Sequence, residues 1–283
     1  MMAICSLNPP GNLAIVSEFP TATVQWIHNH GATPYIRLMF RSSTMQNVQE
    51  PIFKLKDIDA GEFDEDLVDW GKTAGSLGYP LIAEWGTEMN GDWFSWNAKH
   101  NGLAAGAELF NGVYQRIVRK TRDAGAKNVT WVFHVNHRNG PDEPWNKLES
   151  YDPGPEFTDW IGVSLYGAQR PDEATWPVFS ERMATVYPCL ADLEGNRPIM
   201  VCEFGFTDGN PKGKPGPWAK DALDSLLSDR WPRIKGFSWW NEGWPDDQHG
   251  RTEMRLQRVK ELADVFRTKL VKNDKVVDQP IVG

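Results

Sequence analysis

The segment PLIAEWGTEMNGDWFSW, residues 80–96, joins a short apolar run to a polar loop. Its first part is typical of a buried strand, and Glu88 follows that strand directly. A second segment, RPIMVCEFGF at residues 197–206, repeats the arrangement, because an apolar run ends there in Glu203. A carboxylate that closes an apolar strand loses hydration and lowers stability unless it is paired or used in function. The two segments therefore predict strands that carry functional carboxylates at their carboxyl ends.

Similar apolar runs recur along the chain and alternate with longer amphipathic segments. The strand candidates are Ala3–Leu7, Pro34–Phe40, Pro80–Trp85, Asn128–His134, Trp160–Leu165, Pro198–Glu203 and Ile234–Trp240. The helix candidates are Thr21–Asn29, Phe63–Ser76, Leu103–Ala124, Trp176–Ala191, Trp218–Leu227 and Thr252–Lys269. Repeated alternation of strand and helix predicts an α/β fold in which helices cover a parallel sheet.

Two α/β architectures compete for this pattern. An open doubly wound sheet is expected to carry a glycine-rich phosphate turn after an early strand, and no G-x-G-x-x-G occurs here. The 283 residues suit a (β/α)8 TIM barrel, which typically needs about 250. Seven strands are clear, so the first of eight is weak, within Leu13–Val16, or missing before Ala3. We predict one catalytic domain over residues 1–283, with a tail from about residue 273.

Composition narrows the possible partners. A formal net charge of -8 argues against nucleic acid, because phosphate binding needs clustered Lys and Arg. No run approaches 18 apolar residues, so no membrane span is expected, and the first residues lack the pattern of a signal peptide. Three cysteines, Cys5, Cys189 and Cys202, do not form a disulfide framework. A neutral ligand and a monomeric chain are the expectation.

Tryptophan is unusually frequent, with 14 residues in the chain. Several of these lie at strand ends or in the loops after them, namely Trp93, Trp96, Trp145, Trp239, Trp240 and Trp244. A flat aromatic ring in a polar loop suits stacking against the apolar C–H face of a sugar, although each ring could instead anchor its loop on the core. The cluster favours a carbohydrate ligand.

Cleavage of a glycosidic bond fits the pair of glutamates. One carboxylic acid protonates the leaving oxygen, and the other carboxylate attacks the anomeric carbon or activates water. Because active sites of barrels form at the carboxyl ends of the strands, Glu88 and Glu203 can both face one site. No metal or cofactor is required for this chemistry.

The motifs resemble those of glycoside hydrolase family 26. Glu88-Met89-Asn90-Gly91-Asp92-Trp93 is similar to the acid/base motif of that family, and Met200-Val201-Cys202-Glu203-Phe204-Gly205 to its nucleophile strand. The segments 128–132 and 159–163 resemble its fifth and sixth strands, and the likeness runs from about Phe19 to Trp240. In that alignment Pro34–Phe40 is the third strand, so the missing strand falls at the start of the chain.

The resemblance implies a retaining endo-acting enzyme on a β-linked polysaccharide such as mannan, mixed-linkage glucan or β-1,3-xylan. It implies that Glu203 is the nucleophile, Glu88 the acid/base and Tyr166 a hydrogen-bond partner of Glu203. Two positions depart from the family. Thr87 stands where a histidine that helps to orient the nucleophile is usual, and Glu84 stands where an arginine is common.

Other residues at strand ends are candidate substrate contacts. The full predicted set for substrate binding is Asn90, Trp93, Trp96, His134, Asn136, Tyr166 and Trp239, with Trp239 preferred over its neighbour Trp240. Glu242 is the best competitor for a catalytic role, and Glu84 a weaker one because it lies inside its strand. The histidine pairs at 28/30 and 134/137 each lack an obvious third ligand, so no metal site is predicted.

Two other functions remain open at this point. A glycan-binding barrel without turnover is favoured by Thr87 and by the short start, and a metal-dependent hydrolase would need ligands that the sequence lacks. Action outside the cell is expected, because polysaccharides are too large to enter cells.

Overall fold

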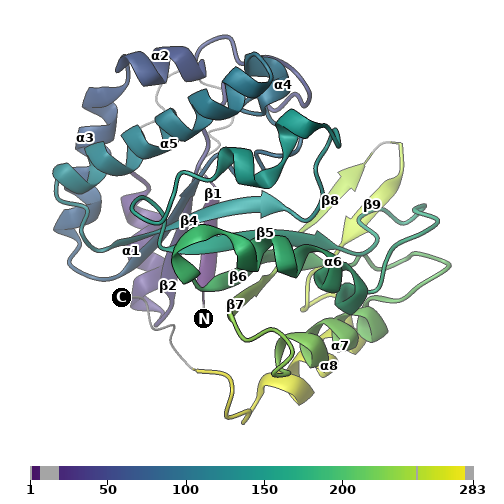
Figure 1. Ribbon diagram of the computed structural model, residues 1–283. Helices are drawn as coiled ribbons and strands as arrows, with labels where there is room; N and C mark the ends of the chain where they lie inside the picture. Colours follow the sequence, from purple (N-terminus) through teal and green to yellow (C-terminus); the bar gives the residue numbers. More distant parts are fainter. Residues whose placement is uncertain (1, 7–18, 247, 278–283) are drawn as a thin grey trace. The chain divides into compact units, whose positions relative to one another are not determined.

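The structure contains a parallel sheet, and helices occur between its successive strands in the chain (Figure 1). The computed structural model describes residues 2–6, 19–246 and 248–277. Its parallel strands are β1 (Met2–Ser6), β2 (Thr33–Leu38), β3 (Leu81–Trp85), β4 (Val129–Asn136), β5 (Trp160–Tyr166), β6 (Ile199–Gly205) and β7 (Ile234–Trp239). All seven predicted strands are thus confirmed, each within about two residues at its ends. The alternative site for a first strand, Leu13–Val16, lies outside the described residues, as does Leu7.

Strand order separates the two candidate architectures. The strands follow one another in the sheet in chain order, from β1 to β7. The pairings of β1 with β2, β2 with β3, β3 with β4 and β6 with β7 are all parallel. A doubly wound sheet would reverse its order at a switch point, whereas a barrel is built from sequential neighbours. The sheet therefore has barrel topology.

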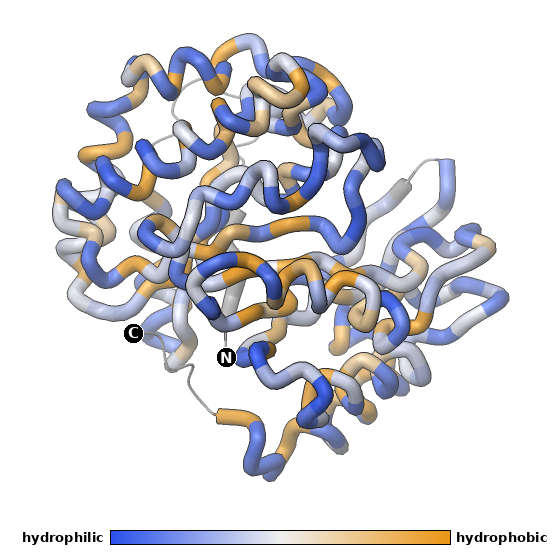
Figure 2. Tube along the Cα trace, viewed as in Figure 1, coloured by the Kyte–Doolittle hydropathy of each residue, from blue (hydrophilic) through white to orange (hydrophobic). Residues whose placement is uncertain are grey.

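The helices that join the strands largely match the predicted ones. They are α1 (Thr21–Asn29), α2 (Leu55–Ala60), α3 (Asp64–Ser76), α4 (Ala98–Asn101), α5 (Ala104–Asp123), α6 (Phe179–Asp192), α7 (Pro215–Leu226) and α8 (Lys260–Leu270). Short 3-10 turns occupy Pro144–Asn146, Leu148–Tyr151 and Glu194–Asn196. Figure 2 shows apolar and polar residues alternating along these helices, the pattern of elements with one buried face.

Helix α5 shows how sequence sets this packing. Its buried residues recur every three or four positions, including Phe110, Tyr114, Ile117 and Thr121. The helix ends before Gly125, whose φ of +117° is the left-handed stop expected from the sequence. Gly71 of α3 lies so close that an added Cβ would stand 2.6 Å from the Thr121 carbonyl oxygen. Absence of a side chain at this position therefore lets α3 and α5 approach closely.

Two compact units make up the chain. The first holds the chain up to Gly162 together with Leu193–Arg197, and the second holds Val163–Asp192 and, from Pro198, the remaining described residues. The first unit contains β1 to β4 and Glu88. The second contains β6, β7 and Glu203. Each unit is therefore described separately below.

One prediction of secondary structure is wrong at its start. The expected helix Thr252–Lys269 begins only at Lys260, and the residues before it form an antiparallel hairpin of β8 (Gly243–Asp246) and β9 (Gly250–Glu253). The reason is local, since Gly250 has a φ of +87° that suits a turn.

Candidate active site

Glu88 follows β3 in an unusual backbone conformation. Its φ is +49°, in the left-handed region that non-glycine residues rarely adopt. Its backbone N–H donates to the carbonyl of His134 on β4 over 2.8 Å, and its own carbonyl accepts from Gly91 over 2.8 Å. Hydrogen bonds on both sides therefore hold this turn at the carboxyl ends of two adjacent strands.

The Glu88 carboxylate has a donor on each oxygen. The Trp93 indole Nε1 donates to Oε2 over 2.9 Å, and the Asn136 amide Nδ2 donates to Oε1 over 2.8 Å. These two bonds fix both the position and the plane of the group. Each carboxyl oxygen offers about two lone-pair sites, so it can still take up a proton or face a ligand. The arrangement suits a residue that exchanges a proton in a set direction.

Asn90 has a different place from the one predicted. It is fully buried, and its amide Nδ2 donates to the Asn136 carbonyl, while its Oδ1 accepts from the Asn136 backbone N–H over 2.8 Å. Nothing of its side chain is exposed for contact with a sugar. Asn90 instead holds Asn136, which in turn holds Glu88.

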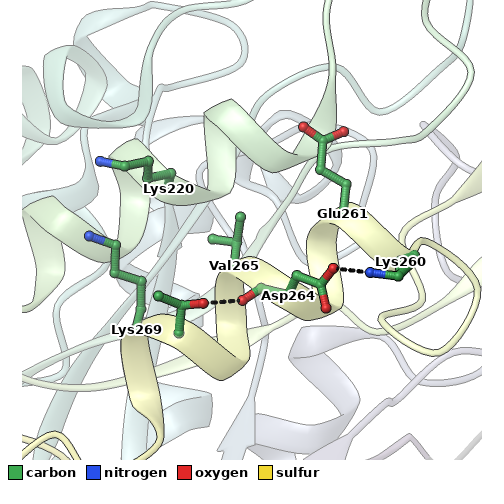
Figure 3. Close-up of a pocket in the computed structure, with 7 residues that line it drawn as sticks. Lys220, Lys260, Glu261, Asp264, Val265 and Lys269 are labelled. Atoms are coloured by element: carbon green, nitrogen blue, oxygen red, sulfur yellow. Dashed lines mark hydrogen bonds and ion pairs between the residues drawn. The ribbon is translucent and has the colours of Figure 1, made fainter.

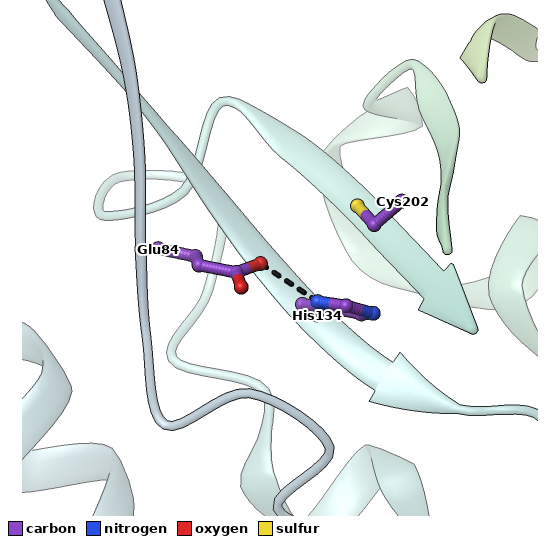
Figure 4. A group of neighbouring side chains, drawn as sticks. All are labelled: Glu84, His134 and Cys202. Atoms are coloured by element: carbon purple, nitrogen blue, oxygen red, sulfur yellow. Dashed lines mark hydrogen bonds and ion pairs between the residues drawn. The ribbon is translucent and has the colours of Figure 1, made fainter. Parts of the chain in front are cut away.

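His134 is likewise buried, contrary to the prediction of a substrate contact. Its Nδ1 lies 2.7 Å from the Glu84 carboxylate and 3.0 Å from the Thr87 hydroxyl (Figure 4). Glu84 also accepts hydrogen bonds from Tyr35 and Arg37, and Arg37 is its register partner on β2. These residues form a buried polar cluster below the loop that carries Glu88.

Charges within this cluster determine the ionisation of Glu84. Burial by itself would raise the pKa of this carboxyl, but Arg37 and His134, together with the Tyr35 hydrogen bond, lower it to about 2. Glu84 is therefore an ionised, paired residue inside its strand, in agreement with its low rank as a catalytic candidate. Thr87, which departs from the family pattern, contacts His134 rather than standing free.

The two tryptophans of the loop after β3 differ in exposure. Trp93 is half-buried beside Glu88. Trp96 is 2% exposed, its Nε1 donates to the Thr87 carbonyl over 2.9 Å, and its ring stacks on Phe94. Trp96 thus has no open face for a sugar, which corrects its prediction as a stacking residue.

Gly91 leaves room for the indole that holds Glu88. A Cβ at this position would lie 2.1 Å from the nearest ring atom of Trp93. We expect Gly91→Ala to displace Trp93 and to lower kcat roughly 10- to 100-fold, because small misplacements of catalytic groups are costly. Steady-state kinetics measure this, with Gly112→Ala on α5 as the control, since its Cβ would meet nothing closer than 3.3 Å. Equal kcat in the two variants would contradict the role given to Trp93.

In the second unit, Glu203 lies on β6 and is buried. The Tyr166 hydroxyl at the end of β5 donates to Glu203 Oε2 over 2.6 Å. The next residue, Phe204, packs against Trp239 and against Phe266 of α8. Phe204 thus packs on the helical layer, whereas the Glu203 carboxylate is bonded to Tyr166 on β5.

Trp239, the tryptophan predicted to contact the substrate, packs on the helices of this unit. Trp239 packs on Trp218 of α7 and Phe266 of α8, and its Nε1 donates to the Met254 carbonyl over 2.7 Å. It is the register partner of Phe204, so it shares the helical face. Trp240 comes directly after the strand, and its backbone N–H donates to the Phe204 carbonyl over 2.9 Å. The sequence held a signal for the packing of Trp239, because Phe237 and Trp239 stand two residues apart and both are apolar.

A hollow of about 470 Å³ lies elsewhere in this unit, between α7 and α8 (Figure 3). Only helix residues line it, and several of its charged side chains are paired, Lys260 with Asp264 and Lys220 with the neighbouring Asp224. It has neither an aromatic side chain nor a strand end, so we do not assign the active site there. Glu242, the competing carboxylate, is exposed.

Comparison with known proteins identifies the family that these features resemble. The sequence model of Glycosyl hydrolase family 26 matches residues 64–188. This range includes Glu88, Asn136 and Tyr166 and ends before Glu203.

Curated relatives are similar at low identity. Endoglucanase H of Acetivibrio thermocellus is 26% identical over 183 residues, which cover 64% of this chain and 19% of that protein. A beta-1,3-xylanase of an Alcaligenes species is 26% identical over 129 residues, covering 45% of this chain and 24% of that protein. A mannan endo-1,4-beta-mannosidase of Bacillus subtilis is 24% identical over 174 residues, covering 59% of this chain and 40% of that protein. The matched segments thus span less than half the length of each of these relatives.

Solved structures share the fold. A Bacillus subtilis mannanase aligns with a TM-score of 0.62 and 16% identity, covering 100% of this chain and 81% of that chain. A Cellulomonas fimi endo-beta-1,4-mannanase double mutant aligns with a TM-score of 0.65 and 16% identity, covering 91% and 58%. The predicted (β/α)8 barrel is therefore confirmed, with seven of its strands among the residues that the structure describes. The family match over residues 64–188 and the shared barrel confirm the resemblance to glycosyl hydrolase family 26 that was predicted from the sequence.

Proposed function

We propose that this protein is a retaining, endo-acting glycoside hydrolase that cleaves β-linked polysaccharide. The single observation that carries the proposal is that each of two glutamates at strand ends is held by its own donors. Glu88 is fixed by Trp93 and Asn136, and Glu203 by Tyr166. Similarity to an endoglucanase, a β-1,3-xylanase and mannanases supports a β-glycan substrate, with mannan the first choice.

The proposed reaction proceeds in two displacements. Glu88 donates its proton to the glycosidic oxygen while a carboxylate oxygen of Glu203 attacks the anomeric carbon, so that the glycosidic bond breaks and a glycosyl ester forms. Glu88, now ionised, takes a proton from water, which attacks the same carbon and breaks the ester bond. Two inversions give net retention. The Tyr166 hydroxyl orients the attacking carboxylate throughout.

Sugar binding is assigned to the side chains that remain available at the strand ends. Trp93 and Asn136 contact Glu88 and therefore lie beside the bond to be cleaved. Trp240, the residue after β7, replaces Trp239 as the proposed aromatic contact, because Trp239 packs on α7 and α8. In the described part of the chain, no helix has both the length and the apolar character needed to cross a membrane. We propose that the protein acts outside the cell as a monomer, because its polymeric substrate cannot enter cells.

A panel of polysaccharides tests the activity directly. We expect release of reducing ends from mannan, barley β-glucan or β-1,3-xylan, with initial products of mixed length, as endo-cleavage requires. Turnover should be unchanged by a chelator, because neither displacement needs a metal. Binding to these polymers without release of reducing ends would instead support a glycan-binding barrel, the function that Thr87 favoured in the sequence. Proton NMR of the first-formed product should show the anomeric configuration of the substrate.

A further inference from the structure

The hairpin β8–β9 is the feature of the second unit that the proposed chemistry leaves unused. It begins at Gly243, four residues after β7 ends at Trp239, and its two strands pair with each other (Figure 1). It therefore extends from the carboxyl end of a barrel strand, the end at which Glu203 closes β6.

The base of the hairpin is bound to the chain just after Glu203. The Glu253 backbone N–H donates to the Thr207 hydroxyl over 2.9 Å, and the Glu253 carbonyl accepts from the Asp208 N–H over 2.8 Å. At Gly205, an added Cβ would lie 2.6 Å from the Met254 sulfur. The hairpin is thus held within a few residues of the proposed nucleophile.

Its other side is bound to the loop that follows Tyr166. The Thr252 hydroxyl donates to the Gln169 carbonyl over 2.7 Å, and the His249 Nδ1 lies 2.6 Å from the Asp172 carboxylate. The hairpin therefore bonds to both segments that carry the nucleophile and its hydrogen-bond partner. Such anchoring fixes any side chain that the hairpin presents.

Trp244 is an exposed aromatic side chain of this hairpin. It stands opposite Thr252 in the hairpin register, on the same face, yet it is 36% exposed whereas Thr252 is fully buried. An exposed indole contributes little to the packing of the core. At a fixed position it offers a flat apolar surface to a ligand. The charged neighbours Glu253 and Arg255 are paired with each other, so the site does not select for a charged ligand.

We propose that Trp244 is a platform for a pyranose ring of a neutral β-linked polysaccharide, at a subsite beyond the two that flank the bond that is cleaved. This inference rests on the proposed function for the identity of the chain that is bound. The flat face of the sugar stacks on the indole, while the catalytic glutamates act on a different residue of the same polymer.

Kinetics on oligosaccharides of defined length test the platform. We expect Trp244→Ala to lower kcat/KM about tenfold on a hexasaccharide and to leave kcat/KM on a trisaccharide unchanged, since a trisaccharide can span the cleaved bond without filling that subsite. Trp244→Phe should recover most of the loss. Trp26→Ala on α1, where the ring is 61% exposed, is the matched control and should not change either value. An equal loss on both lengths, or no loss on either, would overturn the inference.

A binding measurement distinguishes a failure of this inference from a failure of the proposed function. In a Glu203→Gln background, affinity electrophoresis in soluble mannan or barley β-glucan should show retardation that Trp244→Ala reduces and Trp26→Ala does not. If the wild-type protein hydrolyses no polymer but this difference persists, the proposed function fails and the platform stands. If hydrolysis is normal and the two variants migrate alike, the platform fails and the proposed function stands.

Discussion

Glu203→Ala is expected to abolish turnover of polysaccharide, with a loss in kcat on the order of 10⁴-fold or more. The carboxylate that Tyr166 orients is the group proposed to form the covalent bond, and alanine leaves nothing to attack the anomeric carbon. Initial rates of reducing-end release measure the effect. A matched control is Glu242→Ala, because this exposed carboxylate also follows a strand of the same unit and should leave kcat unchanged.

Glu88→Ala should also lower turnover, but azide should partly restore it. We expect a loss of about 10²–10⁴-fold on polysaccharide, because proton transfer to the leaving oxygen is removed while the nucleophile remains. With an aryl glycoside, whose leaving group needs no proton, azide should partly restore turnover and give a glycosyl azide of retained configuration. If azide instead rescues Glu203→Ala to the retained product, the two roles are exchanged.

The second large effect concerns the fold. The substitution Glu84→Ala is expected to cost about 3–5 kcal/mol of the free energy of unfolding, because the buried charge of Arg37 would lose the carboxylate that it pairs with. The melting temperature should fall by roughly 10 °C. Circular dichroism during heating measures this. Asp69→Ala breaks an exposed ion pair with Lys72 and should cost less than about 1 kcal/mol.

The contribution of Glu84 also has a predictable pH dependence. Its folded-state pKa of about 2 lies below the ordinary value of 4.5, so the ionised form favours the folded state. This stabilisation is fully present above about pH 4.5 and is lost as the pH falls toward 2. The difference in melting temperature between the wild type and Glu84→Gln should therefore shrink across this window. A difference that stays constant from pH 6 to pH 3 would contradict the assigned ion pair.

Much of the fold could be predicted from local pattern. Buried parallel strands are continuous apolar runs, and helices with one buried face have a clear period, so seven strands and six helices were recognised from the sequence. The hairpin could not be found in this way. Trp244, Thr252 and their neighbours are a short, polar, turn-rich segment, and the bonds that fix it come from Gln169 and Thr207, far away in the chain.

The candidate site was only partly predictable from the sequence, because the direction and the burial of a side chain depend on contacts between distant segments. Residue type and strand position were enough to select Glu88 and Glu203 as candidates. The face to which a side chain points depends on strand pairing, so Trp239 was preferred although it packs on the helices. The burial of polar side chains was also not predictable from the sequence. His134 and Asn90 are polar residues near Glu88 in the structure, but both are buried, with hydrogen bonds to Glu84 and Asn136.

The left-handed backbone at Glu88 has a consequence for laboratory evolution at this position. Glycine, asparagine and aspartate adopt a φ of +49° most easily, whereas valine, isoleucine and threonine are strained there. In a saturation library, soluble clones should therefore be biased toward the first group regardless of activity. Glu88→Gly is then the preferred inactive variant for trapping an intact oligosaccharide in crystals, since it removes the carboxylate and relieves the backbone at once.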